Sequence, residues 1–161
     1  MTNAKNRPES VDVALEELMP LIRECMAKGQ SVRFYPHGVS MLPMLRPGKD
    51  SVLLSPAPKA LKKHDLVLFQ RRNGTYALHR IARAGQTYAL VGDNQTRLEW
   101  GIWRDQVIAI VSAYYRGEKE YAVTHAGYRL YCRIWPAVRR LRRYARAAKR
   151  RVYQYMKRWK Q

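Results

Sequence analysis

The sequence predicts a mainly β domain that follows one amphipathic helix and precedes a long basic helix. Between about Ser31 and Val123, short apolar runs alternate with turn residues, which is typical of strands. Before and after this region the apolar residues recur every three or four positions, which is the period of a helix. We therefore divide the chain into an N-terminal helix packed on the core (1–30), a β-rich domain (31–125) and a basic helical segment (126–161). A chain of 161 residues, 47% of them apolar, can bury a substantial core.

The N-terminal helix is expected between Ser10, a capping residue, and about Lys28, where Gly29 ends it. Pro20 removes one backbone donor and should bend it. Its opposite face is acidic, so we expect the helix to pack on the core rather than to bind a membrane. The apolar face comprises Val11, Leu15, Leu18, Ile22 and Met26.

The β-rich region contains six strand patterns and a seventh, weaker one near its end. Arg72-Asn73-Gly74-Thr75 lies between two of them and is a strong hairpin signal. Other turns are expected at Pro47-Gly48 and at Gly92-Asp93-Asn94. The expected strands are Ser31–Tyr35, Ser51–Leu54, Leu66–Gln70, Tyr76–Arg83, Tyr88–Val91, Val107–Tyr114 and Tyr121–Val123.

Helical spacing resumes at about Tyr128 and continues nearly to the end of the chain. Pro136 disfavours helical geometry at Trp135, so we expect a break there and a long helix from Pro136 onward. The apolar positions are Leu130, Ile134, Val138, Leu141, Ala145, Ala148, Val152, Tyr155 and Trp159.

The net charge of +19 is concentrated in this last helix. From Tyr121 to the end there are 13 Lys and Arg and no Asp or Glu. Like charges three and four residues apart repel each other, and an anionic surface would relieve that repulsion. Residues 128–160 therefore either dock on an anionic membrane surface or cover an apolar face of the domain itself. We disfavour nucleic acid as the partner, and the sequence does not indicate an oligomeric state.

One serine, one histidine and one aspartate stand in settings that suggest nucleophilic catalysis. Ser40 lies in Gly38-Val39-Ser40-Met41-Leu42-Pro43, His79 lies in a strand pattern, and Asp93 lies in Gly92-Asp93-Asn94. A serine nucleophile needs a base within hydrogen-bond reach and a third group that orients the base. The order along the chain is free, because geometry defines such a site.

At these residues the chain resembles the superfamily of type I signal peptidases and self-cleaving LexA-type repressors. Gly38, Ser40, Met41, Pro43 and Leu45 match its nucleophile box. Gly48-Lys49-Asp50 and His64-Asp65-Leu66 resemble its two Gly-Asp strand starts, with Lys49 inserted in the first and His64 in place of glycine in the second. His79-Arg80 followed by Gly92-Asp93-Asn94 resembles the members of the archaeal and endoplasmic-reticulum type, which use histidine as the base. The resemblance covers roughly residues 31 to 112.

The resemblance implies a β-rich catalytic domain and a serine endopeptidase that cleaves a peptide or leader bond. Ser40 would attack, His79 would move the proton, and Asp93 would orient the imidazole, with Glu99 or Asp105 as alternatives. Gly38 occupies the position where signal peptidases often carry an oxyanion-binding hydroxyl. The substrate would be a peptide bound as an added strand, with small residues near the cleaved bond.

Two other hypotheses remain. In the first, the chain is a degenerate member of the superfamily that binds a peptide without cleaving it and docks on a membrane through its basic helix. In the second, it is a LexA-type regulator. The second is disfavoured, because about thirty residues before the core are too few for a helix-turn-helix domain and such repressors use lysine as the base.

We expect neither metal nor cofactor, because the histidines and the cysteines show no ligand spacing. Cys25 and Cys132 are expected to be reduced thiols. Met1 to Ser10 lacks the apolar core of a signal peptide, and no stretch approaches the roughly 18 apolar residues of a membrane span. We therefore expect a cytoplasmic location, at the inner face of the membrane if the basic helix binds lipid.

Overall fold

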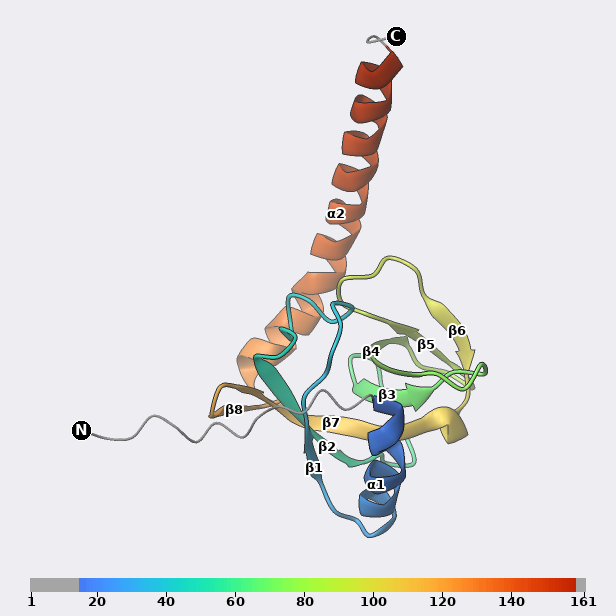
Figure 1. Cartoon of the computed structure of the whole chain (residues 1–161), viewed down its shortest axis with the longest axis vertical. Helices are drawn as coiled ribbons and strands as arrows, with labels where there is room; N and C mark the ends of the chain where they lie inside the picture. The colour runs from blue at the N-terminus through green and yellow to red at the C-terminus, as the bar shows by residue number, and fades with distance from the viewer. Residues whose placement is uncertain (1–14, 159–161) are drawn as a thin grey trace, which may run out of the picture.

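The centre of the molecule is an antiparallel sheet between two helices, which confirms the predicted β-rich domain (Figure 1). The computed structural model describes residues 15–158. Beyond Arg142 it describes the helix backbone and the side chains of Tyr144, Ala148 and Met156. The elements are α1 (Leu15–Ala27), β1 (Val32–Phe34), β2 (Asp50–Pro56), β3 (Leu66–Gln70), β4 (Tyr76–Arg83), β5 (Tyr88–Val91), β6 (Glu99–Ile102), a 3₁₀ turn (Arg104–Gln106), β7 (Val107–Arg116), β8 (Lys119–Ala122) and α2 (Ala126–Arg158).

The strands of the described region form one sheet in the order β1-β2-β7-β3-β4-β5-β6, and β8 pairs with β7. Strand β6 is an addition to the strands expected from sequence. Its pattern Glu-Trp-Gly-Ile is short, is interrupted by a glycine with φ +71°, and carries little strand propensity. Pairing with β5 stabilises it instead.

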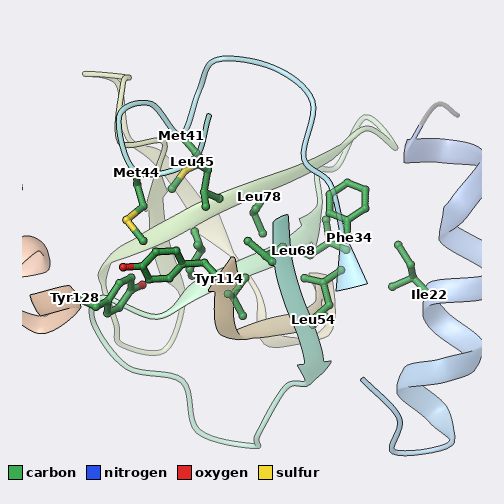
Figure 2. Packing of buried hydrophobic residues seen from close by; sticks show 14 of the residues in the cluster. Ile22, Phe34, Met41, Met44, Leu45, Leu54, Leu68, Leu78, Tyr114 and Tyr128 are labelled. Atoms are coloured by element: carbon green, nitrogen blue, oxygen red, sulfur yellow. The ribbon is translucent and has the colours of Figure 1, made fainter. Parts of the chain in front are cut away.

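Two clusters of buried side chains lie on the two faces of β3. Leu66 and Leu68 belong to one cluster, and Val67 and Phe69 belong to the other. Because successive side chains of a strand point to opposite faces, a strand covered on both sides reads as an unbroken apolar run. The first cluster joins the sheet to both helices and to the loop after β1; Figure 2 shows Ile22, Phe34, Met41, Met44, Leu45, Leu54, Leu68, Leu78, Tyr114 and Tyr128 within it.

Helix α1 packs on the first cluster through Met19 and Ile22, which are fully buried. Leu15, Leu18 and Met26 are partly buried against the same cluster, as expected for a core-packing helix. Met19 adds to the expected face. The proposed cap at Ser10 and the apolar residue Val11 lie outside the described residues.

Helix α2 is continuous from Ala126 to Arg158 and contains Pro136, so the expected break at Trp135 is wrong. Local sterics disfavour helical geometry before a proline, but tertiary contacts hold Trp135 in the helix. Its indole N–H donates to the backbone carbonyl of Asp93 (2.8 Å), and its ring stacks on Tyr131. The first turns of α2 thus lie against the sheet domain, and the remainder projects away from it (Figure 1). Among residues 15–158, no helix has the length and apolarity that crossing a membrane requires.

Candidate active site

The loop that carries Ser40 connects β1 to β2 and is anchored by its own apolar side chains. Met41, Met44 and Leu45 are buried in the first cluster and point from the loop toward the sheet (Figure 2). Gly38 precedes the serine with φ +93°, a conformation that favours glycine, and Pro43 is exposed. The sequence box therefore consists of residues that fix the loop, and Ser40 itself remains partly accessible.

A salt bridge fixes the other end of the loop. The buried carboxylate of Asp50, at the start of β2, accepts hydrogen bonds from the backbone N–H of Arg46 (2.8 Å) and from its guanidinium (2.9 and 2.7 Å). These bonds hold the pKa of Asp50 below its ordinary value against the opposing effect of burial. The chain is thereby closed on itself between residues 46 and 50.

The Gly92-Asp93-Asn94 turn, which follows β5, contacts the Ser40 loop directly. The Asn94 backbone N–H donates to the Ser40 carbonyl (2.8 Å), and the Asn94 side-chain amide donates to the Val39 carbonyl (3.2 Å). A Cβ on Gly92 would lie 2.6 Å from the Ser40 carbonyl oxygen and 3.1 Å from His79 Nε2. The backbone of Ser40 and the imidazole of His79 therefore converge on a point that only a glycine leaves free.

His79 lies on β4 opposite Val67 of β3, and its side chain is 1% exposed. Its ring packs against Phe69 with 5.8 Å between centroids. Glu99 Oε1 is 2.9 Å from His79 Nδ1, but it lies off the line of a well-formed hydrogen bond. Arg71 holds the same carboxylate in a two-point contact of 2.6 and 2.8 Å.

These surroundings determine the charges at the site. Burial lowers the pKa of His79 below its ordinary value, although the neighbouring carboxylate of Glu99 acts in the opposite direction. The hydrogen bond from Arg71 lowers the pKa of Glu99. At neutral pH the site therefore contains an uncharged imidazole next to an ionised carboxylate, which is the state that a general base requires.

The expectation that Asp93 orients His79 is corrected by the structure, because its carboxylate is bound elsewhere. Both of its oxygens accept hydrogen bonds from Arg80 (2.9 and 2.8 Å), and one also accepts from the Tyr131 hydroxyl (3.0 Å). Arg80 follows His79 along β4, so its side chain points to the opposite face of the sheet. Asp93 is therefore the ion-pair partner of Arg80, not of His79.

Of the two alternative acidic residues, the structure brings Glu99 to His79 and leaves Asp105 elsewhere. Asp105 is exposed in the 3₁₀ turn after β6 and borders a separate surface depression with Trp103. The Gly92-Asp93-Asn94 match favours Asp93, whereas the pairing of β6 with β5 places Glu99 beside His79.

A cavity of about 580 Å³ opens beside the serine and the histidine. Its wall includes polar groups from Arg71 and Gln95 and apolar groups from Phe34 and Leu45. Within the described part of the chain, Ser40 Oγ makes no hydrogen bond to His79. Such contacts are often loose without substrate and tighten in the reacting complex.

Sequence reasoning missed three residues of the site: Arg71, Gly92 as a point of close approach, and Gln95. Arg71 belongs to the hairpin read only as a turn. Gln95 directly follows the Gly-Asp-Asn turn, and its side-chain oxygen lies 3.1 Å from the position of a Gly92 Cβ. In the sequence, the only sign of these three residues is that they lie in or next to the two predicted turns, at 72–75 and at 92–94.

The second strand start in the sequence pattern shows a related feature. His64, which stands where the resemblance has glycine, has φ +81°, and is unique in this respect among the non-glycine residues that the structure describes. This conformation is the one that glycine adopts without strain. The backbone here therefore has the shape that a glycine at this position would favour.

Comparisons of the chain with protein-family models, with curated proteins and with solved structures gave no match. Within residues 15–158, no three His, Cys, Asp or Glu side chains lie close enough together to hold a metal ion. Cys25 and Cys132 are free cysteines.

Proposed function

We propose that this chain is a serine endopeptidase of the signal peptidase and LexA-like superfamily, with Ser40 as nucleophile and His79 as base. One observation carries the proposal: the Ser40 backbone and His79 Nε2 converge at Gly92, beside a cavity, while Glu99 lies at the other ring nitrogen. A nucleophile, a base and an acid that orients the base are the three parts of such a site.

In the proposed reaction, Ser40 Oγ attacks the carbonyl carbon of the scissile peptide bond and its proton passes to His79 Nε2. The imidazolium is stabilised by Glu99 at Nδ1, and Arg71 keeps that carboxylate ionised and oriented. His79 then returns the proton to the leaving amine. Water, activated by the same imidazole, hydrolyses the acyl-enzyme and restores Ser40.

The negative oxygen of the tetrahedral intermediate would bind to the Ser40 backbone N–H. Gly38 supplies no hydroxyl, and loss of one such donor costs roughly 2.7–4 kcal/mol of transition-state stabilisation in other hydrolases. The Gln95 side-chain amide lines the same cavity and is a candidate for a replacement donor. Its backbone N–H already donates to the Gly92 carbonyl, which holds residue 95 at the site.

The substrate we propose is an extended peptide. Among the described strands β1 is at the edge of the sheet and has one neighbour, β2, and its last residue, Phe34, lines the cavity. A strand edge offers free backbone donors and acceptors to a peptide, and the cavity next to Ser40 would receive one side chain. The family resemblance implies small residues near the cleaved bond.

The test is cleavage of a peptide library by the purified chain, with Ser40→Ala, His79→Ala and the exposed-serine control Ser31→Ala. We expect Ser40→Ala and His79→Ala each to lose cleavage, and the double variant to lose no more than either, because the pair acts as a unit. Circular dichroism checks folding. Normal turnover by His79→Ala would contradict the assignment of the base.

A second candidate is a catalytically degenerate member that binds a peptide at the same cavity. It is favoured by the absence of a hydroxyl at residue 38 and of a Ser40–His79 hydrogen bond in the described structure. A fluorophosphonate probe separates the two: an active enzyme is labelled at Ser40, whereas the degenerate protein binds library peptides without labelling or cleavage.

A further inference from the structure

Helix α2 has one face that contacts the sheet domain. Tyr128 and Cys132 are buried there, and the Arg80 guanidinium donates to the Tyr128 hydroxyl (2.8 Å) and to Cys132 Sγ (3.0 Å). Tyr131 and Trp135 extend the same contact to Asp93. These residues fix the first turns of the helix on the domain.

A different face of α2 carries an apolar stripe, which we define by Leu130, Ile134, Leu141 and Met156. Their exposed fractions are 57%, 52%, 69% and 57%. At 3.6 residues per turn, the spacing of four and seven between the first three places them on one side of the helix. Leu130 and Ile134 are exposed even though they alternate with the buried Tyr128 and Cys132. The stripe therefore points away from the domain.

The first turns of this helix cover part of the domain, but they do so with a face other than the apolar stripe. A helix that covered its own domain with the stripe would bury Leu130 and Ile134, the stripe residues nearest to the sheet. Instead the contact with the domain is made by Tyr128 and Cys132, which belong to the first cluster, and by the hydrogen bonds of Tyr131 and Trp135 to Asp93. The stripe remains without a partner among the described residues.

The charge around the stripe is of one sign. Arg129, Arg133 and Arg140 are exposed on the docked half of α2, and Arg142 lies over the Trp135 ring at 5.4 Å. The sequence from Tyr121 to the end contains 13 basic and no acidic residues. An occupant of this face must therefore be apolar at its centre and negative around it.

We propose that this face of α2 binds an anionic lipid surface. Acyl chains cover the apolar stripe, and phosphate headgroups meet the arginines beside it. Nucleic acid offers the charge but no apolar surface for Leu130, Ile134 and Leu141. A second copy of the helix offers the apolar stripe but brings its own positive charges against the first. A negatively charged bilayer matches both features.

The experiment measures co-sedimentation of the full chain with vesicles of phosphatidylcholine alone or with added phosphatidylglycerol. The stripe variant is Ile134→Gln/Leu141→Gln/Met156→Gln, which leaves the net charge unchanged. The charge variant is Arg133→Gln/Arg140→Gln. Its matched control, Lys28→Gln/Lys59→Gln, removes two exposed charges at the end of α1 and in the loop after β2.

We expect binding to the anionic vesicles only, and weaker binding as salt is raised. The stripe variant and the charge variant should each bind at least tenfold more weakly, and the lysine control should bind like the parent chain. Circular dichroism verifies that each variant is folded, which exposed positions should permit.

Three results would overturn the proposal. Undiminished vesicle binding by the folded stripe variant would mean that charge alone acts. Binding to a DNA or RNA oligomer that depends on α2, without binding to vesicles, would identify nucleic acid as the occupant. A dimer in analytical ultracentrifugation that the stripe variant abolishes, again without lipid binding, would identify a second copy of the chain.

Discussion

Two adjacent residues of β4, His79 and Arg80, each face a carboxylate, and they use it in opposite ways. Arg80 and Asp93 form a buried ion pair with two-point geometry, and further partners from α2 complete it. His79 is as deeply buried, but its carboxylate, Glu99, is half-buried and is shared with Arg71. One pair is closed within the core, whereas the other borders the cavity.

The comparison separates a structural ion pair from the pair to which we assign a chemical role. Asp93 keeps Arg80 charged, so the pKa of the guanidinium lies well above its usual value despite burial. Glu99 does not keep His79 charged, because burial prevails and lowers the imidazole pKa. A permanently charged group such as Arg80 can stabilise the fold through its ion pair. A group such as His79, which can gain or lose a proton near neutral pH, can transfer that proton in a reaction.

The largest expected effect comes from breaking the structural pair. Asp93→Ala should destabilise the protein by about 3–5 kcal/mol, because it leaves Arg80 buried without its counter-charge. Urea unfolding measures this loss. The milder variant Asp93→Asn keeps the shape of the side chain and, where it folds, should retain peptide cleavage. Loss of cleavage by fully folded Asp93→Asn would return Asp93 to the role of orienting His79.

The opposite result is expected on the chemical side. Glu99→Gln should lower turnover by about 10²–10⁴-fold, because the amide cannot stabilise the imidazolium that forms at His79. Its effect on stability should stay near 1 kcal/mol, since the carboxylate is partly exposed. Steady-state cleavage kinetics and urea unfolding of the same preparation measure the two quantities. A variant with large loss of stability and normal turnover would reverse the assignment.

The contact between the Ser40 loop and the His79 strand can be tested without touching a polar group. Gly92→Ala places a methyl group 2.6 Å from the Ser40 carbonyl oxygen, so the loop must shift. A displacement near 1 Å costs roughly 10²-fold in rate. Gly85→Ala is the control, because its methyl group would have 3.7 Å to its nearest neighbour. Equal rates for both alanine variants would show that the close approach does not position the serine.

The smallest effect is a change with pH, which distinguishes the buried imidazole of His79 from the buried guanidinium of Arg80. The cleavage rate should be flat from about pH 6.5 to 8 and fall about tenfold per unit below the lowered pKa of His79, because the protonated ring cannot accept a proton. A histidine with a lowered folded-state pKa also contributes stability that is lost as pH falls below about 6.5. Circular dichroism over the same range separates protonation of the site from unfolding, and Arg80 should remain charged throughout.

Local sequence patterns determined much of this molecule. Strands β3, β4 and β5 lie at the residues that alternation and turn signals predicted, since period and turn chemistry are properties of short segments. The apolar face expected for the N-terminal helix is also present, because Ile22 is buried and Leu15, Leu18 and Met26 pack against the first cluster. The three-and-four spacing of apolar residues predicted the helix of α2, and the run of arginines and lysines predicted that it is basic.

Tertiary structure decided what depends on contacts between distant residues. Strand β6 exists through its pairing with β5, and α2 passes Pro136 because Trp135 is bound to Asp93. Which of Asp93 and Glu99 lies beside His79 depends on the side of β4 that each carboxylate approaches and on the pairing of the strands next to β4. The sequence alone does not distinguish the two acids. In the folded chain, Arg80 and His79 point to opposite faces of β4, and Asp93 lies on the side of Arg80 whereas Glu99 lies on the side of His79.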